Sequence, residues 1–216
     1  MKVLISGSSR GIGLKIVEKF IACGHFVVGF DIAETQFLHE NYRHYIVDVT
    51  SEELPDLGNF DIVISNAGVQ TQSIKDIEVN LIGAMNFVEK YAFNDDIKSV
   101  LIVSSASAST GAEFKEYCAS KGGLLSYTKN VALRLAPYKA TANSLSPGGV
   151  ITPMNEHILS SEKLYKKVLD ETLLGKWATA EEMAEFAYFL TVVNQSMTGQ
   201  DVFVDNGEAL KSNFIW

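Results

Sequence analysis

KVLISGSSRGIG, at residues 2–13, is the stretch that decides the fold. Its apolar start over Lys2–Ser6 predicts a buried strand, and from Leu14 to Ile21 apolar residues recur at helical spacing. The glycines between strand and helix let the chain turn tightly and let its backbone approach a ligand. Because unpaired N–H groups at a helix N-terminus favour an anion, this turn predicts a site for the pyrophosphate of a nucleotide. A plain strand-to-helix turn is the alternative.

The rest of the chain continues this alternation of β-rich and helical segments. The pattern predicts an α/β fold with a doubly wound, mostly parallel, seven-stranded sheet and helices on both faces. The expected strands are Lys2–Ser6, Phe26–Phe30, Tyr45–Val47, Asp61–Ser65, Ser99–Ser104, Thr141–Ser146 and Asp201–Val204. Besides the first helix, helices are expected over Ile77–Val88, from about Glu116 to Leu135, and from a capping box at Thr179–Glu182 to about Leu190.

Composition limits the class of protein. The chain has 216 residues, 47% of them hydrophobic, which suits one domain over residues 1–216 and is short for two. No apolar run reaches the roughly 20 residues of a membrane helix, and a net charge of -8 argues against a nucleic-acid partner. Cys23, Cys118 and the four histidines show no metal-ligand spacing. We therefore expect a cytoplasmic protein that binds small molecules and no metal.

Asp31 stands directly after the second expected strand. A carboxylate in that place accepts hydrogen bonds from the hydroxyls of an adenosine ribose and repels a 2′-phosphate, which favours NAD over NADP. Arg10, beside the glycine turn, argues for NADP, because a guanidinium pairs with that phosphate. A turn or helix-capping aspartate is the structural alternative for Asp31.

Tyr117 and Lys121 are four residues apart, which places a phenol and an ammonium on one face of a helix. A free tyrosine has a pKa of about 10, and a neighbouring cation favours its phenolate form. Lys121 is therefore able to tune Tyr117 as a proton donor and acceptor. The same spacing is common in surface helices, so its meaning depends on the residues around it. Cys118, between the two, is interpreted as a packing residue.

These motifs, taken in order, resemble those of the short-chain dehydrogenase/reductase (SDR) family, with this chain as a shortened member. The glycine turn has the spacing Gly-x-x-x-Gly-x-Gly, and a serine pair, Ser104-Ser105, precedes the tyrosine as it does in the family. The resemblance covers nearly the whole chain and implies a Rossmann-type fold. It also implies a set of catalytic residues, namely Asn80, Ser105, Tyr117 and Lys121.

The resemblance further implies where a cofactor binds. Asp48 and Val49, closing the third strand, match the position that contacts the adenine edge, and Asn66-Ala67-Gly68 matches an element that allows close backbone approach, with Ser65 in place of an asparagine. The backbone of Val150 would face the nicotinamide carboxamide. The full set is Gly7, Ser9, Arg10, Gly11, Ile12, Gly13, Asp31, Asp48, Val49, Asn66, Ala67, Gly68, Tyr117, Lys121, Pro147, Gly148, Val150 and Thr152.

The implied activity is hydride transfer between NAD, with NADP as the alternative, and a secondary alcohol or ketone. Tyr117 would protonate the substrate oxygen, Ser105 would position it, and Lys121 with a water held by Asn80 would restore the proton. The family also implies a homodimer or homotetramer. Two other functions stay open: a nucleotide sensor or scaffold without turnover, and a sugar-nucleotide epimerase or dehydratase, for which the chain lacks the length of a second domain.

Two connections depart from the family. Only Thr50–Phe60 separates the third and fourth strands, and only Val69–Val79 precedes Asn80. Both are shorter than usual, so we expect trimmed helices and a more open adenine side. Residues 154–175 are expected to cover the substrate, whose identity this segment and Ala106–Glu116 would determine.

Overall fold

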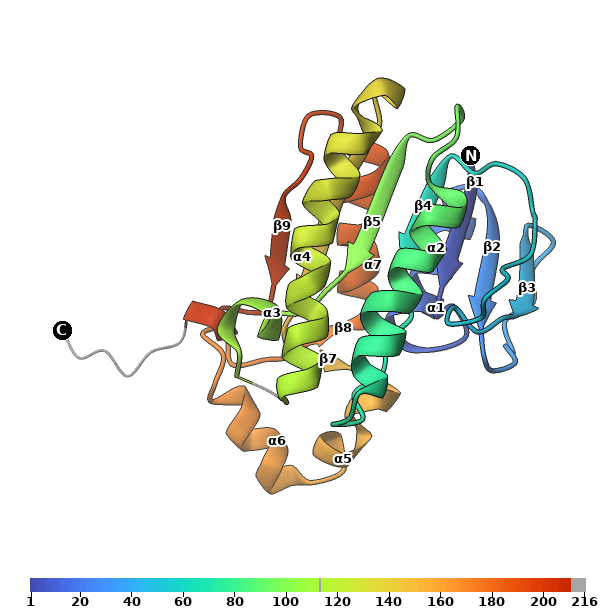
Figure 1. Cartoon of the computed structure of the whole chain (residues 1–216). Helices are drawn as coiled ribbons and strands as arrows, with labels where there is room; N and C mark the ends of the chain where they lie inside the picture. Colours follow the sequence, from blue (N-terminus) through green and yellow to red (C-terminus); the bar gives the residue numbers. More distant parts are fainter. Residues whose placement is uncertain (113, 211–216) are drawn as a thin grey trace.

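The protein is built around one twisted sheet of parallel strands. The computed structural model describes residues 1–112 and 114–210 (Figure 1). Seven strands pair in the order β3-β2-β1-β4-β5-β6-β9, every pair parallel. Their bounds are β1 (Lys2–Ser6), β2 (Phe26–Asp31), β3 (Tyr42–Ile46), β4 (Ile62–Ser65), β5 (Ser99–Val103), β6 (Thr141–Pro147) and β9 (Asp201–Val204). The expected parallel sheet and its seven strands are confirmed.

The strand order reverses between β1 and β4. Val3 of β1 pairs with Val27 of β2 on one side and with Ile62 of β4 on the other, so the chain winds outward in both directions from this point. In open α/β sheets such a reversal leaves a crevice beyond the carboxyl ends of the strands, and ligands bind there.

Helical segments connect the strands and cover the sheet. Their bounds are α1 (Gly11–Ala22), η1, a π-helix (Ile77–Gly83), α2 (Ala84–Tyr91), α3 (Ser107–Thr110), α4 (Lys115–Leu135), η2 (Ala136–Tyr138), η3 (Pro153–Asn155), α5 (Glu156–Leu159), α6 (Glu162–Leu169), α7 (Ala180–Tyr188), η4, a second π-helix (Phe189–Val193), and η5 (Glu208–Leu210). The four predicted helices are present, whereas the shorter ones were not predicted, because segments of three to eight residues are too short to show a clear helical period.

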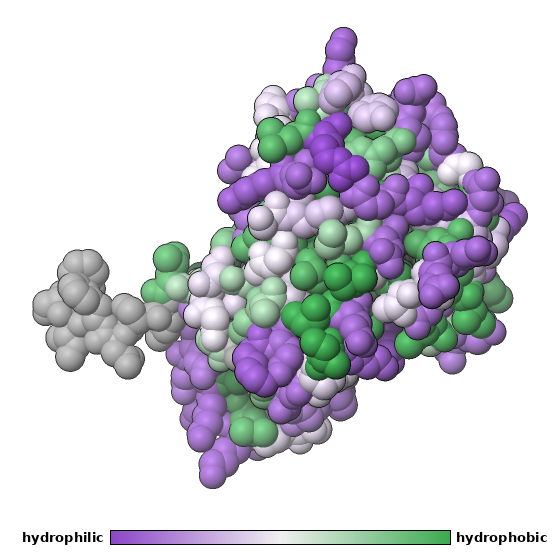
Figure 2. All heavy atoms as spheres, in the orientation of Figure 1, coloured by the Kyte–Doolittle hydropathy of each residue, from purple (hydrophilic) through white to green (hydrophobic). Residues whose placement is uncertain are grey.

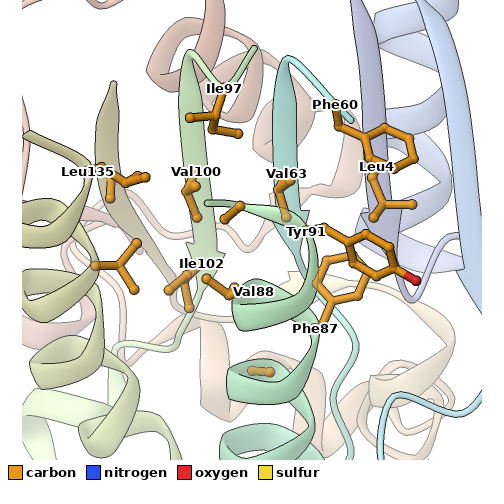
Figure 3. Packing of buried hydrophobic residues seen from close by; sticks show 14 of the residues in the cluster. Leu4, Phe60, Val63, Phe87, Val88, Tyr91, Ile97, Val100, Ile102 and Leu135 are labelled. Atoms are coloured by element: carbon orange, nitrogen blue, oxygen red, sulfur yellow. The ribbon is translucent and has the colours of Figure 1, made fainter. Parts of the chain in front are cut away.

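Each face of the sheet buries its own hydrophobic cluster. Helices α1 and α7 pack on one face, and α2 and α4 on the other (Figure 1). Val3 and Ile5 of β1 point into the first cluster, and Leu4, between them, points into the second. Figure 3 shows the second cluster, in which Phe87 of α2 lies close to Leu4. The interior strands are buried on both sides, as their unbroken apolar runs predict.

One side of the sheet lacks helices. Residues 47–61, between β3 and β4, contain none, which confirms the trimming expected there. Residues 32–41, between β2 and β3, also contain no helix, and this was not predicted. Consequently β3 stays exposed at the edge, with Tyr45 and Ile46 at 40% and 58% of full exposure. The prediction of Tyr45–Val47 for this strand was wrong at both ends. The strand begins at Tyr42. Its start was missed because an edge strand that is half in solvent carries polar residues and therefore shows no apolar run.

The helix that carries Asn80 begins irregularly, and the short connection before it is held by a buried carboxylate. Asp76 accepts hydrogen bonds from the backbone and hydroxyl of Thr71, both at 2.7 Å, and from the backbone of Gln72 at 3.2 Å. The helix then runs as η1 before it becomes α2. Within the described residues, no helix has the length and apolar character needed to cross a bilayer.

The predicted capping box opens α7. The Thr179 hydroxyl accepts a hydrogen bond from the backbone N–H of Glu182 at 3.2 Å, and the Glu182 carboxylate accepts one from the backbone N–H of Thr179 at 2.8 Å. Thr179 also ends β8 (Ala178–Thr179), which pairs with β7 (Val150–Ile151) in a small second sheet that was not predicted. The box therefore fixes both the helix start and this small sheet.

Replacing Thr179 tests the box. Thr179→Ala should lower the free energy of unfolding by about 1 kcal/mol and Tm by about 2–4 °C, because a helix N–H loses its acceptor. Thr179→Ser keeps the acceptor and should retain most of the stability. Thermal unfolding followed by circular dichroism measures both, and equal losses in the two variants would contradict the role of the hydroxyl.

Candidate active site

The glycine turn joins β1 to α1 through a backbone that suits glycine alone. Gly7 and Gly11 have φ values of +69° and +55°, which other residues rarely adopt. At Gly13 an added Cβ would overlap the carbonyl oxygen of Gly7. Helix α1 begins after Arg10 without a side-chain cap, so its first N–H groups are available to an anion. Ile12, in contrast, packs against the α1–α7 cluster.

Asn66 ties the end of β4 to this turn. Its side-chain amide donates to the carbonyl oxygens of Ser6 at 3.1 Å and Gly7 at 3.0 Å. In return, the Ser6 hydroxyl accepts the backbone N–H groups of Asn66 and Ala67, at 3.0 and 3.1 Å. The two strands at the reversal of the sheet are thus bonded together at their carboxyl ends. Ser6 was not predicted as a site residue, because a serine that ends a strand carries no signal of its own.

Asp31 is the last residue of β2 and is 9% exposed. Its Oδ2 accepts the backbone N–H of Ser9 in the glycine turn, and its Oδ1 accepts that of Ala33, both at 3.0 Å. The carboxylate therefore lies beside the turn, as predicted, and each oxygen keeps a further acceptor position. Arg10 is exposed.

Asp48 and Val49 follow β3 instead of closing it, because that strand ends at Ile46. Asp48 is exposed, and its Oδ1 accepts the backbone N–H of Thr50 at 2.9 Å and its hydroxyl at 2.7 Å. Val49 is buried, close to Gly83 of η1. The contact of these two residues with adenine stays a prediction.

Lys121 is an almost completely buried ammonium, 4% exposed. Its Nζ donates to the carbonyl oxygen of Val103, at the end of β5, at 3.0 Å, and lies 5.7 Å from the ring centroid of Tyr117. A Cβ added to Gly68 would lie 3.4 Å from that Nζ and 3.3 Å from Oδ1 of Asn80. The predicted phenol, ammonium and amide are therefore neighbours around Gly68.

Asn80 is fully buried in η1, and its side chain bonds to the backbone of Val69 in the preceding connection. Its Oδ1 accepts the backbone N–H of Val69 at 2.7 Å, and its Nδ2 donates to the carbonyl oxygen of Val69 at 2.8 Å and to the hydroxyl of Ser120 at 3.1 Å. Ser120 in turn donates to the carbonyl oxygen of Tyr117 at 2.7 Å. The Asn80 side chain thus aligns η1 with α4, and it acts by positioning.

The serines after β5 divide into two roles. The Ser104 hydroxyl donates to the carbonyl oxygen of Lys121 at 2.9 Å, which secures α4. The Ser105 hydroxyl accepts the Ser107 backbone N–H at 3.2 Å and the Ser107 hydroxyl at 2.9 Å. Because both bonds use Ser105 as acceptor, its own proton is available to a substrate oxygen. Ser107, which was not singled out, orients Ser105.

The segment after β6 reaches back toward the glycine turn. Pro147 ends the strand, Gly148 follows it, and Val150 is buried in β7. The Thr152 side chain lies 3.7 Å from where a Cβ of Gly11 would be. This places Thr152 beside the predicted pyrophosphate position.

Glu208 is a residue that sequence reasoning missed. Its carboxylate accepts the backbone N–H of Gly149 at 2.9 Å, on a turn where an added Cβ would overlap Trp177. Burial raises the pKa of Glu208, the bond from Gly149 lowers it, and the negative charges of Asp205 and Glu171 raise it further. No pattern could reveal the role of this carboxylate, because it depends on the C-terminal turn folding onto the end of β6.

The predicted residues thus converge at the carboxyl ends of β1, β2, β4, β5 and β6, along the crevice where the strand order reverses. Residues 1–112 and 114–210 hold no group of three side chains suited to a metal. His157 lies on α5, in the segment predicted to cover the substrate. The arrangement combines a proton donor, a buried cation and a turn for an anion.

Comparison with known proteins agrees with this geometry. A family model described as Enoyl-(Acyl carrier protein) reductase matches residues 7–208. L-xylulose reductase of Bos taurus is 30% identical, over 95% of this chain and 95% of that protein. 3-oxoacyl-acyl-carrier-protein reductase of Haemophilus influenzae is 26% identical, over 94% of this chain and 96% of the relative.

The fold is shared with solved structures. The ligand-free aldohexose dehydrogenase of Thermoplasma acidophilum has a TM-score of 0.88 and 24% identity, covering 100% of this chain and 96% of that one. The alignment with L-xylulose reductase spans 234 positions against 216 residues here. The relative therefore has insertions that this chain lacks, consistent with the trimmed connections.

The raised pKa of Glu208 predicts a pH-dependent stability. The folded state disfavours the charged carboxylate, so this residue weakens the fold as the pH rises from about 4 through the raised pKa. Glu208→Gln keeps an acceptor for Gly149 and removes the charge. Above pH 6 we expect its Tm to exceed that of the wild type by about 1–3 °C, and the difference should shrink toward zero at pH 4. Glu34→Gln, at an exposed site, is the control, and a pH-independent difference for Glu208→Gln would refute the assignment.

Proposed function

The chain belongs to the short-chain dehydrogenase/reductase family, and on that premise we propose which of its residues carry the reaction. It is an oxidoreductase that moves hydride between a nicotinamide cofactor and a secondary alcohol or ketone. The observation that supports our assignment is the buried Lys121 ammonium 5.7 Å from the Tyr117 ring, on the helix that crosses the carboxyl end of β5.

The residues present fit a dinucleotide. The Ser9 hydroxyl in the glycine turn is buried and has no hydrogen-bond partner in the described part of the chain, so an oxygen of the diphosphate would satisfy it. The turn itself offers the N–H groups that begin α1, and Thr152 faces them from across the crevice. We propose that this side holds the diphosphate and that Asp31 holds the adenosine ribose.

In the reductive direction, hydride for the substrate carbon would come from a nicotinamide bound in this crevice. Tyr117 gives its phenolic proton to the substrate oxygen, which becomes the hydroxyl of the alcohol. Ser105 donates a hydrogen bond to the same oxygen and holds it in place. Lys121 stabilises the phenolate that remains and returns a proton to it. In oxidation each proton moves the other way.

Asn80 supports this chemistry by position. Its amide is fully engaged with Val69 and Ser120, so it keeps η1 in register with the helix that carries Tyr117. The water that the family resemblance places beside Asn80 and Lys121 remains our prediction, as a route for the returning proton.

We propose that the enzyme prefers NAD, with NADP as the alternative. Asp31 supports this preference, because a carboxylate at the ribose position repels a 2′-phosphate. Arg10 is exposed beside the turn and argues for NADP. Residues 154–175 are proposed to cover the substrate.

A homodimer or homotetramer is proposed from the surface over η1 and α4. Figure 2 shows an apolar area where these elements lie. Ile82 of η1 and Ile74, three residues before η1 begins, are exposed. An apolar area on a helical surface marks a contact with another molecule. The cysteines Cys23 and Cys118 are unpaired, which fits the cytoplasmic location that we propose.

Removing the phenolic hydroxyl tests the mechanism. Tyr117→Phe should lower turnover by at least about 100-fold, because the proton donor is lost, with NAD binding and Tm retained. Activity is screened against sugars, polyols and small ketones by nicotinamide absorbance. Tyr127→Phe removes a hydroxyl from the same helix far from the crevice and should leave turnover unchanged.

Full turnover in Tyr117→Phe would refute the assigned role. If the wild type binds NAD and turns over nothing, the result favours the sensor or scaffold as the alternative function. Binding is followed by protein fluorescence, so the two outcomes are separated.

The choice of cofactor is tested at Asp31. In Asp31→Ala the affinity for NAD should fall about ten-fold, because hydrogen bonds to the ribose are lost, and the affinity for NADP should rise. Titrations of both nucleotides give the dissociation constants. Glu34→Ala removes an exposed carboxylate three residues away and should change neither. Tighter binding of NADP than of NAD by the wild type would show that Arg10 outweighs Asp31.

A further inference from the structure

A buried chain of hydrogen bonds runs from the glycine turn to the connection after β2. Tyr42, the first residue of β3, is 5% exposed, and its hydroxyl lies 3.1 Å from the Ser8 hydroxyl and 3.2 Å from Nδ1 of His44. Nε2 of His44 lies 2.9 Å from the carbonyl oxygen of Ala33. At the other end, the Ser8 hydroxyl lies 3.3 Å from the carbonyl oxygen of Phe30.

The sequence makes room for this chain of contacts. At Gly29 of β2 an added Cβ would overlap both the Ser8 and the Tyr42 hydroxyl, so a residue without a side chain lets them meet. Burial raises the pKa of Tyr42, the bond from its hydroxyl to Ser8 lowers it, and the negative charge of Asp31 raises it further. The phenol is therefore neutral and close to the Asp31 carboxylate.

The two ends of the chain meet the residues that hold Asp31. Ala33, which accepts from His44, also donates its backbone N–H to Oδ1 of Asp31 at 3.0 Å. Ser8, at the other end, precedes Ser9, whose backbone N–H bonds Oδ2 of Asp31 at 3.0 Å. Residues 32–41 form no helix that could cover this part of the sheet. These hydrogen bonds therefore hold the Asp31 carboxylate in place without the packing that a helix would provide.

The proton count shows that His44 keeps both of its contacts in two charge states. The Ala33 carbonyl accepts only, so Nε2 of His44 carries a proton in both. With neutral His44, Tyr42 donates to Nδ1 and Ser8 donates to Tyr42, so the Phe30 carbonyl receives no bond from the Ser8 hydroxyl. With protonated His44, Nδ1 donates to Tyr42, Tyr42 to Ser8, and Ser8 to Phe30. Protonation thus reverses two bonds and adds the one to Phe30, and His44 gains a charge without leaving its place.

The charged groups around His44 are few. It lines a hollow of about 470 Å³ together with His39, Glu40 and Arg43. The Arg43 guanidinium donates to the carbonyl oxygens of Glu40 and Tyr42 and lies 5.8 Å from the Phe26 ring. Across the chain of bonds lies Asp31. A proton on His44 thus adds a positive charge next to the residue that would repel a 2′-phosphate.

We propose that Ser8, Tyr42 and His44 form a relay that positions Asp31 and makes the discrimination between NAD and NADP depend on pH. The inference rests on the proposed function, in which Asp31 holds the adenosine ribose. Because a proton on His44 adds a positive charge on the side of Asp31, the preference for NAD should weaken as the pH falls.

The experiment measures Kd for NAD and NADP at pH 8 and pH 5.5 on the unmodified chain, on His44→Gln and on the control His39→Gln. For each protein the ratio of Kd for NADP to Kd for NAD is compared between pH 8 and pH 5.5. From pH 8 to pH 5.5 this ratio should fall in the wild type by a factor about three- to ten-fold larger than in His44→Gln. Protonation of the 2′-phosphate itself affects all proteins alike, so the comparison isolates His44. The control His39→Gln should behave as the wild type.

Tyr42→Phe gives an independent test. It keeps the buried ring and breaks the relay, so protonated Nδ1 of His44 has no acceptor, and the pH dependence of the ratio should approach that of His44→Gln. The relay would be overturned if the ratio of the two Kd values changed equally with pH in the wild type and in a folded His44→Gln or Tyr42→Phe variant. Failure of the wild type to bind either nucleotide would instead overturn the proposed function.

Discussion

The lack of space between Gly13 and the carbonyl oxygen of Gly7 is the constraint on which the rest of the structure depends. Because no Cβ fits there, α1 starts directly against the end of β1, and the crevice at the reversal of the sheet lies beside the N-terminus of that helix. A side chain at Gly13 would push the helix away, so that neither its N–H groups nor Asp31 would keep their positions.

Hydrogen bonds connect this glycine turn to the residues around Lys121. Asn66 bonds Ser6 and Gly7, Gly68 follows it along the chain, and Gly68 lies between Asn80 and Lys121. The distance between the glycine turn and the Tyr117 phenol is thus set by a fixed backbone. The side chains of Asn66, Asn80 and Lys121 hold this backbone through hydrogen bonds. This fixed spacing supports our proposal that the glycine turn and the Tyr117 phenol act as one site.

The sequence predicts the interior strands and the long helices well, since their residues are apolar in unbroken or periodic runs. It predicts β3 poorly, because Tyr42 and His44 pair at an edge and look like loop residues. The glycine turn, Tyr117 and Lys121 have fixed spacings and are visible, whereas Glu208 and Tyr42 act through contacts between distant segments. Such contacts leave no local pattern, and only the folded chain shows them.

Because helices are missing on either side of β3, the edge of the sheet at β3 should unfold locally more easily than its centre. Backbone amides of β3 have one neighbouring strand and little cover, so they should exchange with solvent sooner than those of β1, β4 and β5. Ligand bound against Asp31 would supply part of the absent cover, and the occupied fraction would then set how often this edge unfolds. In this shortened chain, a nucleotide bound there would stabilise the edge of the sheet in place of the missing helices.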